Sequence, residues 1–299
     1  MTDLATAPSV DRTGAGPSVS GAPAPHMLAD LDALRAGLRS LGSVVVAFSG
    51  GADSAFVARV ATDTLGADRV LCVTAVSPSL APEELEDCRS LAAEWGLRYL
   101  EVVTDELADP SYAANDGSRC YHCKASLLSA LGPVADAAGP TATVVLGVNL
   151  DDLDDHRPGQ TAAAERGAVF PLVTAGFTKA DVRGWSRRLG LRTWDKPAAA
   201  CLASRVPYGT RVTFTTLDAV ARAESGLRDL GFRQLRVRHY GDTARIEVPT
   251  EELAGVVAAR EAVCAAVHGA GYRYVTLDLD GFRSGNLNDS LTTTTEATP

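Results

Sequence analysis

The amino-acid sequence predicts a doubly wound α/β fold with a parallel sheet, followed by a smaller C-terminal α+β domain. Strand-like apolar runs alternate with helix-like segments over residues 28–195, the order typical of a parallel sheet with helices on both faces. After residue 213 the order becomes helix, strand, strand, helix, strand. We therefore expect domains at 26–212 and 213–285, with a disordered lead at 1–25 and a disordered tail at 286–299.

The elements of the first domain follow from local patterns. Leucines at helical spacing predict a first helix over residues 28–41, and the apolar run Val44–Phe48 predicts the first strand. Later strands are expected at 70–76, 99–103, 142–148 and 168–172, and helices at 55–61, 82–95, 124–138 and 178–189. Thr178 is the expected N-cap of the last helix, and residues 105–119 are expected to be irregular.

The second domain is expected to have helices at 214–230 and 251–268 and strands at 234–239, 243–248 and 273–279. In the first two strands, alternation places Arg236 and Arg238 on one face with Glu247, opposite an apolar face. From the pattern alone this polar face is either a binding surface or an ordinary solvated face.

Composition excludes several classes of protein. The chain has 299 residues, 46% of them hydrophobic, so it can bury a large core. A formal net charge of −9 disfavours a nucleic-acid partner. No apolar run approaches the roughly 20 residues of a membrane span, and no basic-then-apolar leader predicts secretion. We expect a cytoplasmic protein with reduced cysteines and no membrane partner.

The stretch Ser49-Gly50-Gly51-Ala52-Asp53-Ser54 lies between the first strand and its helix. Adjacent glycines let the backbone approach a ligand and turn N–H groups inward, and the helix start adds its positive dipole end. The loop therefore predicts an anion site, the alternative being a plain helix start. Ligands of such sheets bind at the carboxyl ends of the strands, where Asn149 also lies. Asp151, Asp152 and Asp155 follow the same strand, and they either hold magnesium against a nucleotide or form an acidic surface loop.

Three cysteines are candidates for chemistry. Cys120 and Cys123 form a C-x-x-C motif beside Arg119 and Lys124 at a helix start, where cations and the helix dipole lower a thiol pKa, so thiolates are expected. The motif fits half a zinc site, a redox pair, part of an iron–sulfur site or two packed cysteines. Cys201 lies in a loop rich in small residues, near Arg205. Packing roles are expected for the other three cysteines, Cys72, Cys88 and Cys264.

Four motifs in order carry a family resemblance. S-G-G-x-D-S resembles the pyrophosphate loop of the PP-loop ATP-pyrophosphatase superfamily, which has a Rossmann-like fold and cleaves ATP between its α and β phosphates. With R-C-Y-x-C-K, G-x-N-x-D-D-x-x-D-x-R-P-G and K-P-x-x-A-C-L-A-S-R-x-P-Y-G, the chain resembles the LarE family over residues 30–280. These are ATP-dependent sulfur transferases of nickel-pincer nucleotide biosynthesis.

The resemblance implies a substrate and a reaction. ATP would adenylate a carboxylate of pyridinium-3,5-biscarboxylic acid mononucleotide, and sulfur would displace AMP to give a thiocarboxylate. In one family mode the cysteine matching Cys201 gives up its sulfur and becomes dehydroalanine. In the other, Cys120, Cys123 and Cys201 hold a 4Fe–4S cluster that carries sulfide. We expect the cluster mode, because sacrifice needs only Cys201. A homo-oligomer, trimer or hexamer, and contacts with nickel-pincer pathway enzymes are also implied.

The resemblance assigns roles to named positions. ATP and Mg²⁺ would be held by Ser49, Gly50, Gly51, Asp53, Ser54, Asn149 and Asp152. The substrate phosphate would be held by Ser204, Arg205, Arg236 and Arg238, and a divalent metal by Glu247, for which a second acidic ligand is not apparent. A tRNA-thiolating enzyme would need a basic surface or an added domain. An amide-forming ligase or a nucleotide sensor would not need the three cysteines.

Overall fold

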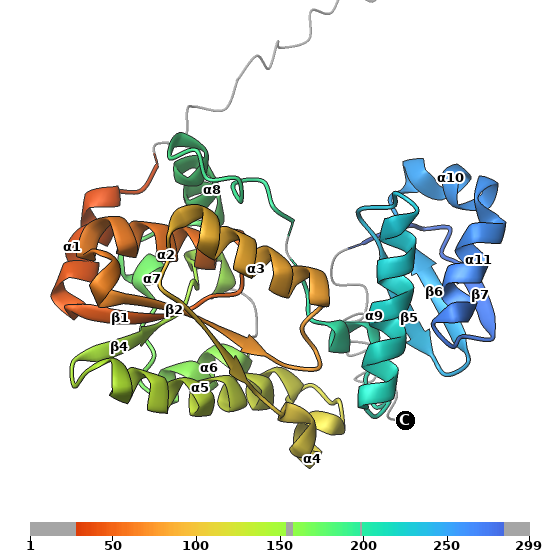
Figure 1. The fold of residues 1–299 in the computed structure, drawn as a ribbon, viewed down its shortest axis with the longest axis horizontal. Helices are drawn as coiled ribbons and strands as arrows, with labels where there is room; N and C mark the ends of the chain where they lie inside the picture. Colours follow the sequence, from red (N-terminus) through yellow and green to blue (C-terminus); the bar gives the residue numbers. More distant parts are fainter. Residues whose placement is uncertain (1–27, 154–157, 198, 284–299) are drawn as a thin grey trace, which may run out of the picture.

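The computed structural model describes residues 28–153, 158–197 and 199–283. They form a four-stranded parallel sheet enclosed by helices and, beside it, a three-stranded sheet with helices of its own (Figure 1). The expected lead at 1–25, the expected tail at 286–299 and Asp155 lie outside the described residues. None of the helices in these ranges is both long and apolar enough to cross a membrane.

The larger sheet has the strand order β3-β2-β1-β4. Its strands are β1 (Ser43–Ala47), β2 (Val70–Val76), β3 (Tyr99–Val103) and β4 (Ala142–Val145), and every pair is parallel. Val45 pairs with Leu71 on one side and Val144 on the other. The run Val44, Val45 and Val46 is buried because β1 is central and covered on both faces.

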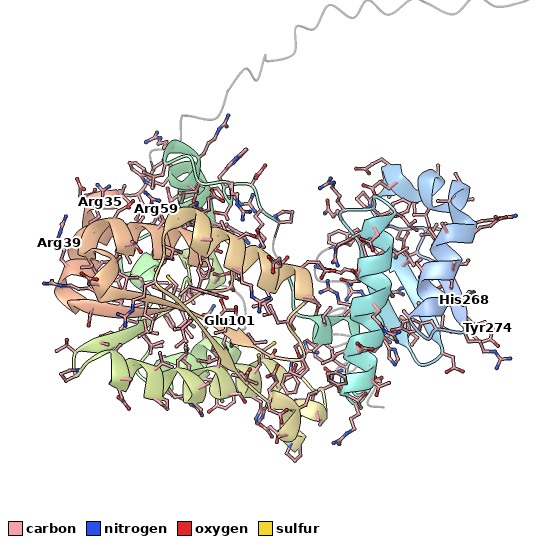
Figure 2. All side chains as sticks on the ribbon, viewed as in Figure 1. Arg35, Arg39, Arg59, Glu101, His268 and Tyr274 are labelled. Carbon is pink, nitrogen blue, oxygen red and sulfur yellow. The ribbon has the colours of Figure 1, made fainter. Side chains whose placement is uncertain are left out.

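Helices cover both faces of this sheet (Figure 1). On one face α1 (Leu31–Leu41), α2 (Ala52–Leu65), α3 (Pro82–Trp95), α7 (Pro171–Thr174) and α8 (Lys179–Arg188) pack into one apolar core. On the other face lie α5 (Arg119–Ala138) and α6 (Pro158–Glu165). Arg35, Arg39 and Arg59 point outward from α1 and α2 (Figure 2). The predicted doubly wound α/β fold is confirmed.

The connections explain where a ligand can bind. From β1 the chain moves through α2 to β2 and through α3 to β3, and then returns through α5 to β4 on the opposite side of β1. The strand order therefore reverses between β1 and β4. In open α/β sheets such a switch point opens a crevice at the carboxyl ends of the strands. The loops at Ser49–Ser54 and Gly147–Asp152 leave the sheet at this point.

Several expected boundaries were wrong. The stretch 105–119 contains the short helices η2 (Glu106–Ala108) and α4 (Pro110–Ala113), and α5 begins at Arg119 instead of Lys124. A side-chain cap causes part of this, because Asp109 accepts a hydrogen bond from the Ser111 backbone N–H. The expected strand at 168–172 is one bridge, Val169 to Val145, since Pro171 has no N–H for a ladder. Thr178 caps α8 as predicted.

The second region has α9 (Phe214–Asp229), β5 (Arg236–Tyr240), β6 (Thr243–Glu247), η5 (Thr250–Glu252), α10 (Leu253–Ala258), α11 (Arg260–Gly269) and β7 (Tyr274–Leu277). β5 and β6 are antiparallel, and β7 is parallel to β6. The expected single helix at 251–268 is broken at Ala259, whose φ and ψ of −91° and 16° are not helical. Val237, Ala244 and Ile246 fill the core as the alternation predicted.

A separate apolar cluster joins the two regions. It contains Tyr112 from α4, Leu202 and Ala203 from η4 (Leu202–Arg205), and Leu217 and Val220 from α9. The segment that carries Cys201 therefore lies between the larger sheet and the second region.

Candidate active site

The loop after β1 is closed on itself by its two serines. Ser54 Oγ accepts a hydrogen bond from the Ser49 backbone N–H at 3.2 Å and donates to the Gly51 carbonyl at 3.2 Å. Gly50 has φ of +67°, a conformation that favours glycine. Gly51 is the N-cap of α2 and supplies no side-chain cap. The first N–H groups of α2 are therefore available to an anion such as a phosphate.

Acidic and amide groups from the loop after β4 meet this loop. Asn149 Nδ2 donates to Asp53 Oδ1 at 3.2 Å, and Asp152 Oδ2 accepts from the Asn149 backbone N–H at 3.3 Å. Burial, and next the charge of Asp152, raise the pKa of Asp53. Asn149 is fully buried, and its Oδ1 has no hydrogen-bond partner among the described residues. Asp151 lies apart, where it accepts from the Lys179 backbone N–H.

These groups fit a magnesium ion that arrives with a nucleotide. The described ranges contain no set of three or more His, Cys, Asp or Glu side chains that could hold a metal by themselves. Mg²⁺ usually takes one or two carboxylates and completes its shell with phosphate oxygens and water. Asp53 and Asp152 supply such a pair of carboxylates beside the anion-binding loop.

Gly147 lies where these two loops meet. The sequence placed it at the end of a strand, in the G-x-N-x-D-D motif, but gave it no role. A Cβ at this position would lie 2.7 Å from the Ser54 backbone N and 2.8 Å from the Asp53 carbonyl carbon. Both neighbours are main chain, so no rotamer change can make room.

We expect Gly147→Ala to weaken ATP binding by at least about tenfold, because the β4 loop must move off the start of α2. Isothermal titration with a non-hydrolysable ATP analogue and Mg²⁺ measures this. Gly37→Ala on α1 is the matched control, since a Cβ there meets nothing within 4 Å. Equal affinities in the two variants would contradict the expected role of Gly147.

Lys196 links the Cys201 segment to the same loop. Its Nζ donates to the Gly50 carbonyl at 3.2 Å and pairs with Glu84 at 2.8 Å and Asp87 at 2.6 Å, both on α3. Burial disfavours the charged lysine, but the hydrogen bonds that it donates to Asp87 and Glu84 raise its pKa overall. A cation is therefore held beside the backbone that would face the phosphates.

The three candidate thiols lie on two segments that contact each other through Arg119 and Ala203, and in the described residues they do not form a group that could hold a metal ion. Cys120 and Cys123 are in the first turn of α5, and Cys201 is the exposed N-cap residue of η4. The Cys201 segment reaches the sheet through a hydrogen bond from the Leu202 N–H to the Ser79 carbonyl at 2.8 Å, just after β2. All three thiols are free. Cys72 and Cys88 are fully buried in the sheet core, as expected for packing residues.

The expectation that both C-x-x-C thiols are thiolates was wrong for Cys123. Its pKa is raised to about 12, chiefly by burial; Lys124 lowers it, and Cys201, Glu106 and Cys120 add smaller increases. The helix start and the nearby cation do not compensate for the lost hydration. Cys120 and Cys201 keep their side chains in solvent.

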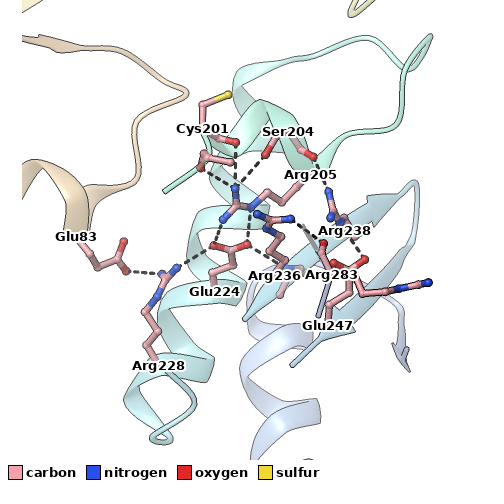
Figure 3. A network of polar contacts seen from close by, with 12 residues as sticks. Glu83, Cys201, Ser204, Arg205, Glu224, Arg228, Arg236, Arg238, Glu247 and Arg283 are labelled. Atoms are coloured by element: carbon pink, nitrogen blue, oxygen red, sulfur yellow. Dashed lines mark hydrogen bonds and ion pairs between the residues drawn. The ribbon is translucent and has the colours of Figure 1, made fainter. Parts of the chain in front are cut away.

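A buried ion-pair network supports the Cys201 segment (Figure 3). Arg205 Nε and Nη2 donate to the two carboxylate oxygens of Glu224 on α9, at 2.8 and 3.1 Å. Arg205 Nη1 also donates to the carbonyls of Ala200 and Cys201, at 2.7 and 3.2 Å. Arg228 binds Glu224 from the other side and reaches Glu83 on α3. Arg205 therefore fixes the main chain at the thiol.

The polar face of β5 and β6 is covered, not solvated. Arg238 and Glu247 are 2% and 0% exposed and pair at 3.0 Å, and Arg238 Nη1 donates to the Ser204 carbonyl at 2.8 Å. Arg238 Nη2 is buried with no hydrogen-bond partner among the described residues. Burial, and then the charges of Arg205 and Arg238, lower the pKa of Arg236. Arg205 and Arg238 contact Ser204, and Arg236 lies close enough to both guanidinium groups to feel their charges.

The structure thus gathers the predicted residues into two sets. One contains Ser49, Gly50, Gly51, Asp53, Ser54, Asn149 and Asp152, and the other contains Ser204, Arg205, Arg236, Arg238 and Glu247. Cys201 lies in the same segment as Ser204 and Arg205, and Cys120 and Cys123 lie on α5, which contacts that segment through Arg119. Sequence reasoning missed Lys196, Glu224, Gly147 and Asn115. Of these, Lys196 and Gly147 carried a signal, as the first residues of the K-P-x-x-A-C and G-x-N-x-D-D motifs.

Comparisons with known proteins identify the family. The chain is 47% identical over 264 residues to an uncharacterised protein of Synechocystis, covering 88% of this chain and 98% of the relative. It is 41% identical over 259 residues to pyridinium-3,5-bisthiocarboxylic acid mononucleotide synthase of Lactiplantibacillus plantarum, covering 87% and 94%. The chain belongs to the LarE family. LarE membership makes it an ATP-using enzyme of the PP-loop superfamily.

The part of this LarE chain that carries the Ser49–Ser54 loop also resembles proteins named for NAD synthesis. The NAD synthase family profile matches residues 32–118, which include β1, β2, β3 and the loop at Ser49–Ser54. An ammonia-dependent NAD⁺ synthetase of Chlorobaculum tepidum is 28% identical over 164 residues, 54% of this chain and 58% of the relative. The family profile ends before Cys120.

Proposed function

We propose that this LarE chain is an ATP-dependent sulfur transferase acting on pyridinium-3,5-biscarboxylic acid mononucleotide. Its relative in Lactiplantibacillus is named for the synthesis of the bisthio product. The observation that carries the proposal is the contact of Lys196 with Gly50, which brings the segment of the exposed Cys201 thiol onto the phosphate loop. A carboxylate activated at the loop can then meet sulfur in the same crevice.

The first step is adenylation. The N–H groups of the loop hold the β and γ phosphates, and Asp53 and Asp152 hold Mg²⁺ against them. A substrate carboxylate oxygen attacks the α phosphorus and pyrophosphate leaves, giving an acyl adenylate. Asn149 Oδ1, buried without a partner, is placed to accept a hydrogen bond from the nucleotide.

The second step forms the thiocarboxylate. A sulfur nucleophile attacks the acyl carbon, the bond to the phosphate oxygen breaks, and AMP leaves with the electron pair. With hydrosulfide as donor, one proton is released. Ser204, Arg205, Arg236 and Arg238 orient the substrate through its own phosphate, since guanidinium groups match phosphate geometry. Repeating both steps on the second carboxylate gives the bisthio product.

We further propose that Cys120, Cys123 and Cys201 hold a 4Fe–4S cluster as the sulfide carrier. The donor set fits in kind, because thiolates are the ligands of such clusters and these three thiols are free. In the described residues they are not gathered into a three-ligand group, so binding the cluster would have to draw them together. Held by these three thiolates, such a cluster would supply an iron that can take up a sulfide for transfer. The alternative is that Cys201 attacks the adenylate itself, loses its Cα proton and breaks its C–S bond, ending as dehydroalanine.

A divalent metal at Glu247 fits less well. Arg238 and Arg245 already pair with this carboxylate at 3.0 and 3.1 Å. A cation would have to displace or face two guanidinium groups, so a metal at Glu247 has no part in the proposed reaction.

We also propose that the chain acts in the cytoplasm as a homo-oligomer and that its product passes to nickel-pincer pathway enzymes.

The test incubates the anaerobically reconstituted chain with the dicarboxylate, Mg²⁺, ATP and sulfide. We expect AMP, pyrophosphate and thiocarboxylate in equal amounts, over several turnovers, with an unchanged chain mass. A loss of one hydrogen sulfide per chain would instead establish sacrifice of Cys201. AMP and pyrophosphate without any sulfur in the product would overturn the sulfur-transfer proposal. Turnover with tRNA as acceptor would support a tRNA-thiolating enzyme.

A further inference from the structure

We propose that Asn115 and Arg119 are positioning residues that set Cys201 against Cys120 and Cys123. They would govern the sulfur step of the proposed function, on which this inference rests, without contributing to ATP binding. Neither side chain contacts the phosphate loop. Both connect the start of α5, which carries the C-x-x-C thiols, to the segment that follows Cys201.

Asn115 makes unusual contacts for a residue in a connecting segment. It is fully buried, and with φ of +57° it is the one non-glycine residue of the described ranges with a positive φ. Asparagine tolerates this conformation better than most residues. Its Nδ2 donates to the carbonyls of Val206, Pro207 and Thr210, at 3.3, 2.8 and 2.9 Å. One amide therefore ties down a turn more than 90 residues later in the chain.

Arg119 extends the same connection toward the thiols. It is 5% exposed, and its Nη1 donates both to Asn115 Oδ1 and to the Ala203 carbonyl, the latter at 2.9 Å. Its guanidinium also lies over the Tyr208 ring, 5.5 Å from the centroid. Arg119 immediately precedes Cys120, and Ala203 is two residues after Cys201. The Arg119 guanidinium thus connects the two segments that carry the thiols, within two residues of Cys120 and of Cys201.

Backbone contacts make the connection stiff. The Gly209 N–H donates to the Asn115 carbonyl at 3.0 Å, and the Val212 N–H donates to the Ala113 carbonyl at 2.9 Å. Tyr112 packs beside Leu202 and Ala203 in the apolar cluster between the two regions. The relative position of the thiols is therefore built into buried hydrogen bonds, and does not depend on the exposed thiol side chains.

Position matters for the sulfur step because reacting atoms must meet at short range. A displacement of about 1 Å can cost about 10²-fold in rate. Loss of the Asn115 amide leaves three carbonyls without their donor and frees the 206–210 turn. We expect the thiols to separate while the crevice between β1 and β4 stays intact.

The experiment uses the full chain with Asn115→Gly, which keeps the positive φ, and with Arg119→Lys and Arg119→Ala. Arg222→Ala is the matched control, because Arg222 also donates to two main-chain carbonyls, Gly269 and Ala270, but remote from the thiols. Thermal melts establish that each variant is folded. A short bismaleimide then measures cross-linking of Cys201 to Cys120 or Cys123 by peptide mass spectrometry, with ATP absent and each single-thiol alkylation rate as reference.

We expect Asn115→Gly and Arg119→Ala to lower the cross-linked fraction about tenfold and thiocarboxylate formation about 10²-fold, with substrate-dependent ATP–pyrophosphate exchange retained. Arg119→Lys, which can serve one carbonyl but lacks the planar fork, should recover part of both. Wild-type cross-linking in a folded Asn115→Gly variant would overturn the inference. Cross-linking does not require turnover, so it decides the inference even if the sulfur-transfer proposal fails.

Discussion

Replacing Cys201 with serine is expected to abolish thiocarboxylate formation, by more than about 10³-fold. Cys201 is exposed at the start of η4 and belongs to both sulfur routes, as carrier ligand or as donor. A serine hydroxyl fills nearly the same volume but holds no sulfur and binds iron poorly. Substrate-dependent ATP–pyrophosphate exchange should remain measurable, because the phosphate loop and its carboxylates are untouched.

Variants of the neighbouring cysteines distinguish the two sulfur routes. If a cluster carries the sulfide, Cys120→Ser and Cys123→Ser should each cause a comparable loss. If Cys201 is the donor, both should retain a single turnover. Cys264→Ser is the control, since Cys264 lies on α11 in the second region. Thiocarboxylate formation by Cys201→Ser at the wild-type rate would rule out both routes.

Glu224→Ala is expected to destabilise the fold by about 3–5 kcal/mol, the range for removing one partner of a buried ion pair. Glu224 is fully buried and accepts hydrogen bonds from Arg205, Arg228 and the Val237 N–H. Its loss leaves Arg205 charged and buried without a counter-ion, while Arg205 also holds the Cys201 carbonyl. Urea unfolding monitored by circular dichroism and by tryptophan fluorescence measures the change in the free energy of unfolding.

Two further variants separate charge from packing. Asp218→Ala removes an acid on the same helix that pairs with exposed Arg222, and it should cost no more than about 0.5 kcal/mol. The double variant Arg205→Met/Glu224→Leu should recover part of the stability, because no buried Arg205 charge is left without its counter-ion, while Arg228 and the Val237 N–H still lose their acceptor. It should not recover sulfur transfer, since the guanidinium on the Cys201 carbonyl is gone. If Glu224→Ala lowered the free energy of unfolding as little as Asp218→Ala does, the stabilising role of the Glu224 network would be contradicted.

Features set by neighbouring residues could be predicted from the sequence. The strand, glycine turn and helix around Ser49–Ser54 follow from a local pattern, and the alternation of strands and helices predicts ligands at the carboxyl ends of the strands. Thr178 was identified as a cap because capping is decided within one turn of helix. The C-x-x-C motif was correctly placed at the start of a helix, although that helix begins at Arg119.

Features set by distant residues could not be predicted. Alternation along β5 and β6 shows that Arg238 and Glu247 share a face, but only the Ser204 segment packing on it decides that the face is buried. The pKa of Cys123 depends in the same way on what covers it. Asn115 lies in a stretch without periodicity, and its partners are more than 90 residues away. No local pattern reports such contacts.

The junction between the two regions limits how this chain can be rebuilt. The segment from Cys201 to Val212 is held from one side by Asn115 and from the other by Glu224 and Arg238. A chimaera that takes its nucleotide half from one relative and its C-terminal half from another would inherit the two supports separately. Such a recombinant should join ATP use to sulfur chemistry only when both parents match at these three positions.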